Sequence, residues 1–329
     1  MKRVIIPEPG KIEIREYQLK EEIRREESLV NIIYCGICGS DVHVFKGKHP
    51  FVEFPVSTGH EVIGIIEKSN KFKTGEYVAI RPSIWDSECY FCKHGMPHIC
   101  ENLKVRGFQE EGLLAEKVIV PNQSIFPLDT SESDIESFSL VEPLSTAVHA
   151  AKLTCLAGQN VAVIGLGTIG VLTAAVAKTY GAKEVVGFDI NSWKVQQAKK
   201  FGFVTESVNS KENKKFKDFD VVFEAVGNQS SVDNAFNLIR KRGTIILIGV
   251  FSGSGTVPLH LIQDREYIIK GALMYTDDDF SESINLIAQK RINTLNLISK
   301  VFEGIEKADQ AFKYASSEQN SFKSLIKLQ

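Results

Sequence analysis

Residues 161–170 read VAVIGLGTIG, an apolar strand pattern that runs directly into three glycines. A helical segment, VLTAAVAKTYGA, comes next, and a second apolar strand, EVVGFDI, then brings the chain to Asp189. A G-x-G-x-x-G sequence alone is weak evidence. A strand before it, a helix after it and an acid about 20 residues further on are the context of a dinucleotide-binding fold. The stretch therefore predicts an α/β unit with a parallel sheet.

Each glycine of this turn has an expected role in holding a dinucleotide. Gly165 would make the tight turn, and Gly167 would let a pyrophosphate approach the backbone. Gly170 would let the helix pack closely on the strand, and the amides that open the helix would face the phosphate. Ile169 lies within the turn and is a candidate cofactor contact with the glycines.

Other candidate cofactor contacts follow along the chain. Asp189 would accept hydrogen bonds from the adenosine ribose and repel a 2′-phosphate, which favours NAD over NADP. Lys194 could reach the same ribose or be solvated. The buried strands DFDVVFEAVG and TIILIGV carry Gly227 and Gly249 near their ends, where ligands of parallel sheets bind. Between these strands, SVDNAFNLIRKRG predicts a helix that Gly243 ends.

The 329 residues are enough for two domains, and the first 140 alternate apolar and polar positions as short antiparallel strands do. The formal net charge is -2, which gives no electrostatic footprint for nucleic acid or an anionic membrane. No apolar run approaches the length of a membrane helix, and the apolar run at the start of the chain is too short for a signal peptide. We therefore expect a cytoplasmic protein.

Residues 36–61 carry a possible metal site. Cys38 offers a thiolate, His60 an imidazole and Glu61 a carboxylate, and a catalytic zinc takes three such ligands and keeps one position open. Ser40 and His43 lie between them and could pass a proton. Cys38 or His60 alone is more simply a packed core residue, but the three ligands together favour Zn²⁺. Further along the chain, Glu142, in EPLSTAVHAA, is a second carboxylate that could reach the metal.

Residues 86–100, DSECYFCKHGMPHIC, show neither helix nor strand periodicity and concentrate metal-binding side chains. The candidate ligands are Asp86, Cys89, Cys92 and Cys100. His94 and His98 are rivals of the aspartate for the fourth place, and a redox cysteine pair is the alternative to a metal site. Four protein ligands leave no open position, so this zinc would be structural.

These motifs carry a resemblance to a known family. GICGSDVH, GHE, the cysteine loop, EPLSTAVHA, VAVIGLGTIG and VVFEAVG follow the order found in zinc-dependent medium-chain dehydrogenases, which act on alcohols, polyols and threonine. The resemblance runs from the first strand to the last. It implies a GroES-like β-rich catalytic domain over 1–144, to which 274–329 return, and a Rossmann NAD-binding domain over 145–273.

The resemblance also implies site residues. Cys38 and His60 would bind a catalytic zinc, with Glu61 or Glu142 completing the site. Ser40 and His43 would match the proton relay of the family, and the pair selecting NAD would be Asp189 and Lys194. A second, structural zinc would sit in the cysteine loop, although Asp86 stands where relatives have a first cysteine.

The expected activity is hydride transfer from a secondary alcohol of a polyol or sugar acid to NAD. Met274 precedes Tyr275 where sorbitol dehydrogenases have arginine, which speaks against sorbitol itself. The alternatives are a threonine or simple alcohol dehydrogenase and a nucleotide-binding relative without catalysis. The partners expected are a small alcohol substrate and further copies of the chain, as a dimer or tetramer.

Overall fold

The computed structural model describes residues 1–20, 22–49, 52–207 and 216–328. The chain forms two compact units, which are described separately here. Unit 1 consists of Met1–Glu142, Ser283–Lys290 and Thr294–Gln329, and unit 2 of Pro143–Glu282 and Arg291–Asn293. The division falls within helices α3 (Val141–Lys152) and α8 (Asp277–Ala288).

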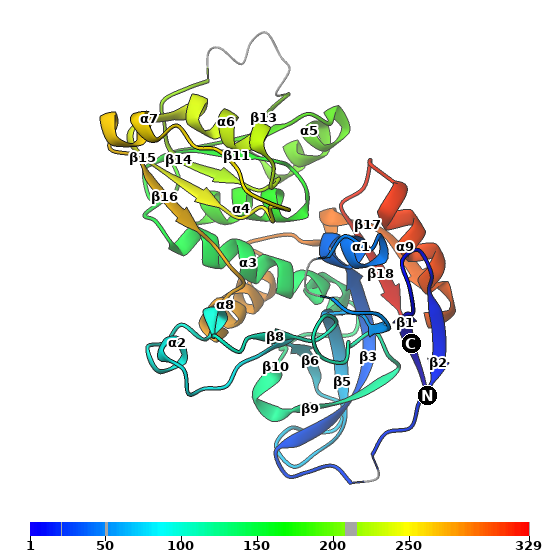
Figure 1. Ribbon diagram of the computed structural model, residues 1–329. Helices are drawn as coiled ribbons and strands as arrows, with labels where there is room; N and C mark the ends of the chain where they lie inside the picture. Colours follow the sequence, from blue (N-terminus) through cyan, green and yellow to red (C-terminus); the bar gives the residue numbers. More distant parts are fainter. Residues whose placement is uncertain (21, 50–51, 208–215, 329) are drawn as a thin grey trace. The chain divides into compact units, whose positions relative to one another are not determined.

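Unit 2 is built on a sheet of parallel strands (Figure 1). The strands are β11 (Asn160–Ile164), β12 (Glu184–Asp189), β13 (Val204–Ser207), β14 (Phe219–Glu224), β15 (Ile239–Leu247) and β16 (Ile268–Gly271). The helices entirely within the unit are α4 (Thr168–Thr179), α5 (Ser192–Ala198), α6 (Gln229–Leu238) and α7 (Leu259–Asp264). Among the described residues the order is β13-β12-β11-β14-β15-β16, and all pairings are parallel. This order, which reverses between β11 and β14, confirms the expected dinucleotide-type sheet.

Two local features of unit 2 follow from the sequence. A Cβ on Gly170 would lie 1.7 Å from the Gly165 carbonyl oxygen, so only glycine lets α4 begin this close to the turn. The expected helix up to Gly243 was wrong at its end, because α6 stops at Leu238. Ile239 already belongs to β15, which takes it into the parallel sheet.

Unit 1 consists mainly of β-strands. The strands are β1 (Lys2–Ile6), β2 (Glu13–Glu16), β3 (Glu27–Ile37), β4 (Val56–Ser57), β5 (Glu61–Ser69), β6 (Tyr77–Ile80), β7 (Ser83–Ile84), β8 (Lys104–Val105), β9 (Lys117–Pro121), β10 (Ile125–Pro127), β17 (Ile298–Glu303) and β18 (Lys323–Lys327). The helices entirely within it are α1 (Gly39–Phe45), α2 (Tyr90–Lys93) and α9 (Ala308–Ser317). The largest sheet runs β10-β6-β5-β3-β18-β17, with β9 also paired to β3. The last strand therefore lies against the strand that leads into the Cys38 stretch.

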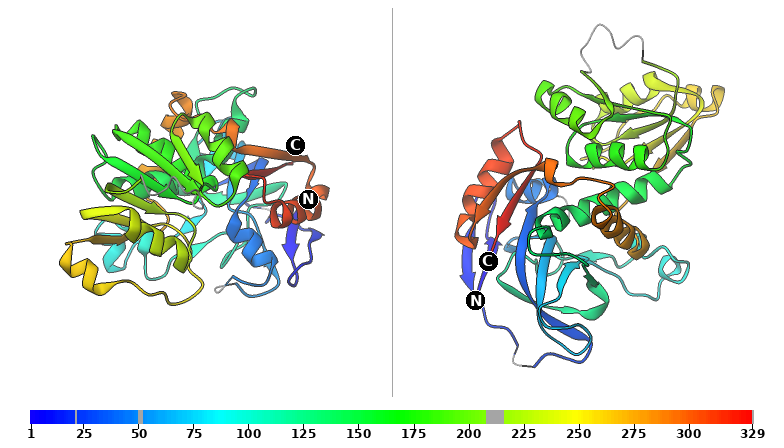
Figure 2. Two further views of the ribbon diagram at one scale, coloured as in Figure 1. Left: turned by 90° about the horizontal axis from the view of Figure 1, so that it is seen from above. Right: turned by 180° about the vertical axis from the view of Figure 1, so that it is seen from behind.

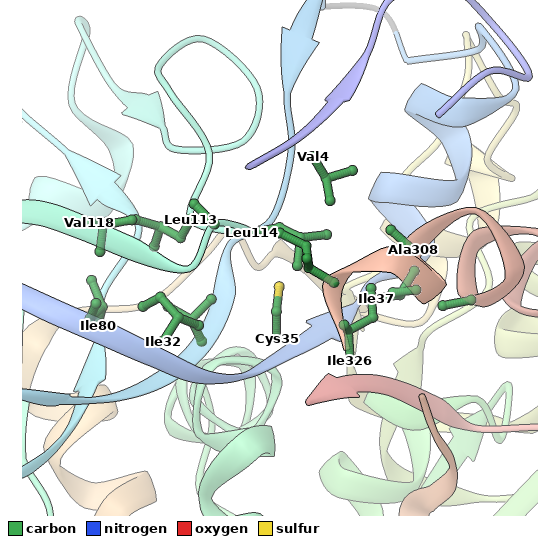
Figure 3. Packing of buried hydrophobic residues seen from close by; sticks show 14 of the residues in the cluster. Val4, Ile32, Cys35, Ile37, Ile80, Leu113, Leu114, Val118, Ala308 and Ile326 are labelled. Carbon is green, nitrogen blue, oxygen red and sulfur yellow. The ribbon is translucent and has the colours of Figure 1, made fainter. Parts of the chain in front are cut away.

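The core of unit 1 gathers side chains from distant parts of the chain. Figure 3 shows Ile32 and Cys35 of β3 close to Leu114, with Ile326 of β18 beside Ile37. In Figure 2, α9 runs along β18, with which it is in contact. Packing on both sides of β3 holds its end in place, and that end carries the metal-ligand stretch.

None of the helices formed by residues 1–20, 22–49, 52–207 and 216–328 is long and apolar enough to cross a membrane.

Candidate functional site

The structure brings three of the predicted metal ligands together in unit 1. One ligand atom each from Cys38, His60 and Glu61 lies within 4.8 Å of the others. Cys38 follows the end of β3 and precedes α1, while Glu61 opens β5, the neighbouring strand. His60 and Glu61 are buried, and Cys38 is only partly so. A thiolate, an imidazole and a carboxylate at this spacing fit a zinc ion.

His60 is oriented by a buried aspartate that our sequence reasoning did not single out. Asp41 Oδ1 lies 3.4 Å from His60 Nδ1 and accepts a 2.8 Å hydrogen bond from the Thr58 hydroxyl. Asp41 Oδ2 accepts a hydrogen bond of 2.9 Å from the Cys38 amide. Because Nδ1 faces Asp41, Nε2 is the ring nitrogen left for a metal, and one carboxylate ties both ligands together. Burial alone would lower the pKa of His60, but Asp41 and Cys38 raise it well above its usual value.

Glu61 is held by a lysine from the last strand. Lys323 Nζ donates to both Glu61 oxygens at 2.7 Å, and the two side chains are 4 % and 0 % exposed. Burial would lower the pKa of Lys323, but Glu61 and Cys38 raise it above its usual value. A Cβ on Gly36 would lie 2.2 Å from Glu61 Oε2, so the glycine of the opposite strand makes room for the carboxylate.

Glu142 is outside this group of ligand atoms, although it is buried and acts electrostatically on Lys323.

The two predicted proton-relay residues lie on one short helix. Ser40 and His43 are three residues apart in α1, which places them on neighbouring turns of the same face. Ser40 is half-buried and His43 is exposed, so the pair leads from the ligand stretch to solvent.

Phe108 supplies an apolar wall beside the ligands. Its ring centroid lies 4.9 Å from that of His60 and 4.7 Å from that of His49, on which it stacks. The aromatic ring shields the His60 imidazole from water on that side.

The cysteine loop forms a second cluster in unit 1. Single ligand atoms of four side chains lie within 4.8 Å of one another, those of Asp86, Cys89, Cys92 and Cys100. Asp86 Oδ1 accepts hydrogen bonds from the amides of Glu88 and Cys89, and Oδ2 accepts one from Asn102. Burial and the neighbouring thiols raise the pKa of Cys92 to about 12, a crowding that a cation would relieve. His94 is outside the cluster and stacks on Tyr90.

The glycine turn of unit 2 and Asp189 are in direct contact. Asp189 Oδ2 accepts a 2.7 Å hydrogen bond from the Leu166 amide, and Oδ1 accepts one of 2.8 Å from Asn191. Apart from its neighbours in the chain, no described residue comes within 4 Å of the place a Cβ on Gly167 would take, so the backbone there is open to a ligand. Lys194 is the third residue of α5, and its amide donates to the side chain of the N-cap residue Asn191. Ile169 lies in the first turn of α4, whose amides have no helical partner and suit a phosphate.

The other two predicted glycines, Gly227 and Gly249, meet at the same carboxyl ends of the strands. A Cβ on Gly249 would lie 2.2 Å from the Gly227 nitrogen. Ile190, Val226 and Val250 follow the ends of β12, β14 and β15 and are 75 %, 45 % and 75 % exposed. Exposed aliphatic side chains around open glycine turns suit the flat rings of a dinucleotide.

Comparison with known proteins agrees with this chemistry. Residues 24–130 match the alcohol dehydrogenase GroES-like domain, and residues 168–289 match the zinc-binding dehydrogenase domain. The chain belongs to the zinc-dependent medium-chain dehydrogenase superfamily. It is therefore an oxidoreductase that acts on CH–OH groups with zinc and a nicotinamide cofactor, and its units have the GroES-like and Rossmann folds.

Individual relatives cover most of this dehydrogenase. D-xylulose reductase A of Aspergillus oryzae is 31% identical over 306 residues, 86% of this chain and 85% of the relative. L-galactonate-5-dehydrogenase of Escherichia coli is 31% identical over 284 residues, 81% of each chain. The crystal structure of L-idonate 5-dehydrogenase from Escherichia coli matches with a TM-score of 0.92 and 25% identity, covering 99% of this chain and 98% of that one.

Proposed function

We propose that this dehydrogenase oxidises a secondary alcohol of a polyol or sugar acid and passes the hydride to NAD. The observation that carries the proposal is the cluster of Cys38, His60 and Glu61, which a protein that only binds nucleotides would not need. The relatives named for D-xylulose, L-galactonate and L-idonate support a polyhydroxylated substrate.

Cys38, His60 and Glu61 would hold the catalytic zinc, with Glu142 as the alternative third ligand. A zinc in this position supplies Lewis-acid polarisation of the alcohol oxygen. Ser40 Oγ would accept the hydroxyl proton while its own proton is passed on toward His43, which is exposed one turn later in α1 and would release a proton to solvent.

The cofactor would lie along the carboxyl ends of the parallel strands. Gly165, Gly167, Ile169 and Gly170 would face its phosphates, and Asp189 would accept from the adenosine ribose. Lys194, Gly227 and Gly249 are the further candidate contacts. NAD is preferred because a 2′-phosphate would meet the charge of Asp189. The second zinc, in the cysteine loop, would be structural.

The two units suggest a division of labour. We assign catalysis to residues 1–144 together with 274–329, and cofactor binding to residues 145–273. The clustering of cysteines as metal ligands favours the reducing environment of the cytoplasm. We also propose that the protein is a homo-oligomer, a dimer or tetramer.

The test is a substrate screen on zinc-loaded protein, read by NADH absorbance, with metal content measured on the same sample. The panel holds polyols, sugar acids, threonine and simple secondary alcohols. We expect the fastest turnover with a polyol or sugar acid, and its loss in Cys38→Ser while NADH binding persists. Faster turnover of threonine, or turnover in Cys38→Ser equal to that of wild type, would refute the proposal.

A further inference from the structure

Glu224 is a fully buried carboxylate at the end of β14, among the residues expected to meet the cofactor. Our sequence reasoning gave it no role. Burying a carboxylate is costly unless hydrogen bonds replace the lost water, so its partners indicate what it does.

The side chain and the backbone of Glu224 bind two separate turns. Its Oε1 accepts hydrogen bonds of 2.8 Å from the amides of both Val226 and Gly227, in the turn after β14. Its backbone carbonyl accepts 2.8 Å and 3.1 Å bonds from Ile248 and Gly249, in the turn after β15. A single residue therefore satisfies four amides on two neighbouring turns.

The turns after β14 and β15 pack so closely that a side chain on either of their glycines would clash. Gly227 has φ +84°, and a Cβ on it would lie 2.4 Å from the Val250 carbonyl oxygen. A Cβ on Gly249 would lie 2.7 Å from Glu224 Oε2. On the other side, a Cβ on Gly165 would lie 2.6 Å from Val226 Cγ2, so the first cofactor turn rests on the turn that Glu224 binds.

Glu224 Oε2 is buried and has no hydrogen-bond partner within the described parts of the chain. This oxygen is closed to solvent, so a cofactor would contact it only if the surrounding turns moved. One oxygen thus carries the side-chain bonding, and a role in positioning the backbone explains the geometry better than direct contact with a ligand.

We propose that Glu224 is a positioning residue for the dinucleotide: its Oε1 fixes the Val226–Gly227 turn, and through it the edge formed with Gly165 and Gly249. This inference rests on the proposed cofactor site. Pre-formed turns would spare the cofactor the cost of ordering them when it binds.

The experiment compares Glu224→Ala and Glu224→Gln with wild type by NADH fluorescence titration. Loss of the two side-chain hydrogen bonds in Glu224→Ala should weaken NADH binding about tenfold or more. Glu224→Gln keeps an oxygen acceptor and should restore binding to within about threefold of wild type. In turnover, Glu224→Ala should raise the KM for NAD far more than it lowers kcat.

Asp220→Ala is the matched control, because Asp220 lies on the same strand and its Oδ2 accepts a 2.7 Å bond from the Asn160 amide at the opposite end. This variant should lose stability yet bind NADH as wild type does. Equal weakening in Asp220→Ala and Glu224→Ala, unchanged binding in Glu224→Ala, or no rescue in Glu224→Gln would overturn the inference.

Hydrogen exchange of the wild-type chain without cofactor gives a readout that survives if Glu224→Ala fails to fold. The amides of Val226 and Gly227 should already be protected and gain little when NADH is added. Free exchange that NADH suppresses would mean that the cofactor, and not Glu224, orders the turn. The NADH titration and the hydrogen exchange both work without turnover. A wild type that binds NADH but is inactive would therefore refute the proposed activity and leave the inference about Glu224 standing.

Discussion

At the scale of single residues, the pair of Lys323 and Glu61 would set the charge of the proposed metal site. Glu61 and a Cys38 thiolate would together neutralise a divalent zinc. The buried ammonium of Lys323 cancels one of these negative charges, so the ion would keep more of its positive charge for the substrate oxygen. The lysine also fixes the carboxylate in place, as hydrogen-bond partners of metal-ligating side chains do.

The same geometry separates the two candidates for the third ligand. We expect Glu61→Gln to lose the catalytic zinc, because its oxygens lie within the ligand cluster, whereas Glu142→Gln should retain it. The measurement is zinc content after dialysis against a weak chelator, with the zinc of the cysteine loop as internal reference. Retention in Glu61→Gln and loss in Glu142→Gln would reverse the assignment.

Asp189 belongs to the residue scale as well. Removing its charge in Asp189→Ala should cut the preference for NADH over NADPH about tenfold or more, since repulsion of the 2′-phosphate disappears. Asp189→Asn, which keeps an acceptor for the Leu166 or Asn191 amide, separates charge from support of the turn. The measurement is the ratio of the two dissociation constants. An unchanged ratio in both variants would place cofactor selection elsewhere.

At the scale of elements, sequence spacing reveals sites whose residues lie close together in the chain. The glycine turn and the cysteine loop are each contained in a short stretch, and Cys38 and His60 are both within residues 36–61. Lys323 comes from the last strand and has no motif, and only the pairing of β18 with β3 brings it to the site. Glu224 looked like one more residue of a buried strand, because its bonds form only after the strands assemble.

If the proposed structural zinc is bound, the fold of the cysteine loop would depend on it. Asp86→Ala removes a candidate ligand and the acceptor of the Glu88 and Cys89 amides, so we expect loss of about one zinc per chain and a lower Tm. The zinc at Cys38 should remain. Asp86→Cys, which offers a fourth thiolate, should bind the loop zinc more tightly than wild type. Activity lost at an unchanged Tm would argue against a structural role.

Within unit 2, helices α3 and α8 are joined by a buried aspartate. Asp279 accepts 2.9 Å hydrogen bonds from His149 and from Lys152. Burial alone would raise the pKa of Asp279, but the bonds from His149, Lys152 and Thr276 lower it below its usual value. Ionised Asp279 therefore stabilises the fold. This contribution is full above the pKa of an unfolded aspartate, about 3.9, and is lost progressively as the pH falls from there through the lower pKa of the folded state.

Asp279→Asn should accordingly reduce the free energy of unfolding by about 2 kcal/mol at pH 7. The difference from wild type should shrink as the pH is lowered from 5 toward 3. Urea unfolding followed by circular dichroism at several pH values measures it. A difference independent of pH would mean that packing, and not the charge, explains the loss.

At the scale of the whole molecule, unit 2 has an edge suited to a second copy of the chain. β16 is the last strand of its sheet, and Ile268 is 48% exposed on it. Leu259 in α7 and Leu273 just after β16 are 71% and 54% exposed. Unpaired backbone groups beside exposed apolar side chains favour strand pairing with another chain.

Charged substitutions on and just after β16 should therefore dissociate the oligomer. We expect the double variant Ile268→Lys and Leu273→Lys to sediment as a monomer where wild type sediments as a dimer or tetramer. Val204→Lys is the control, since Val204 is 43% exposed on β13 at the opposite edge of the same sheet. A monomeric wild type would contradict the oligomer itself. If only Val204→Lys dissociates the oligomer, the interface lies at the β13 edge instead. A lysine at the centre of a contact between two chains places a charge where both chains lose water, and this weakens their binding.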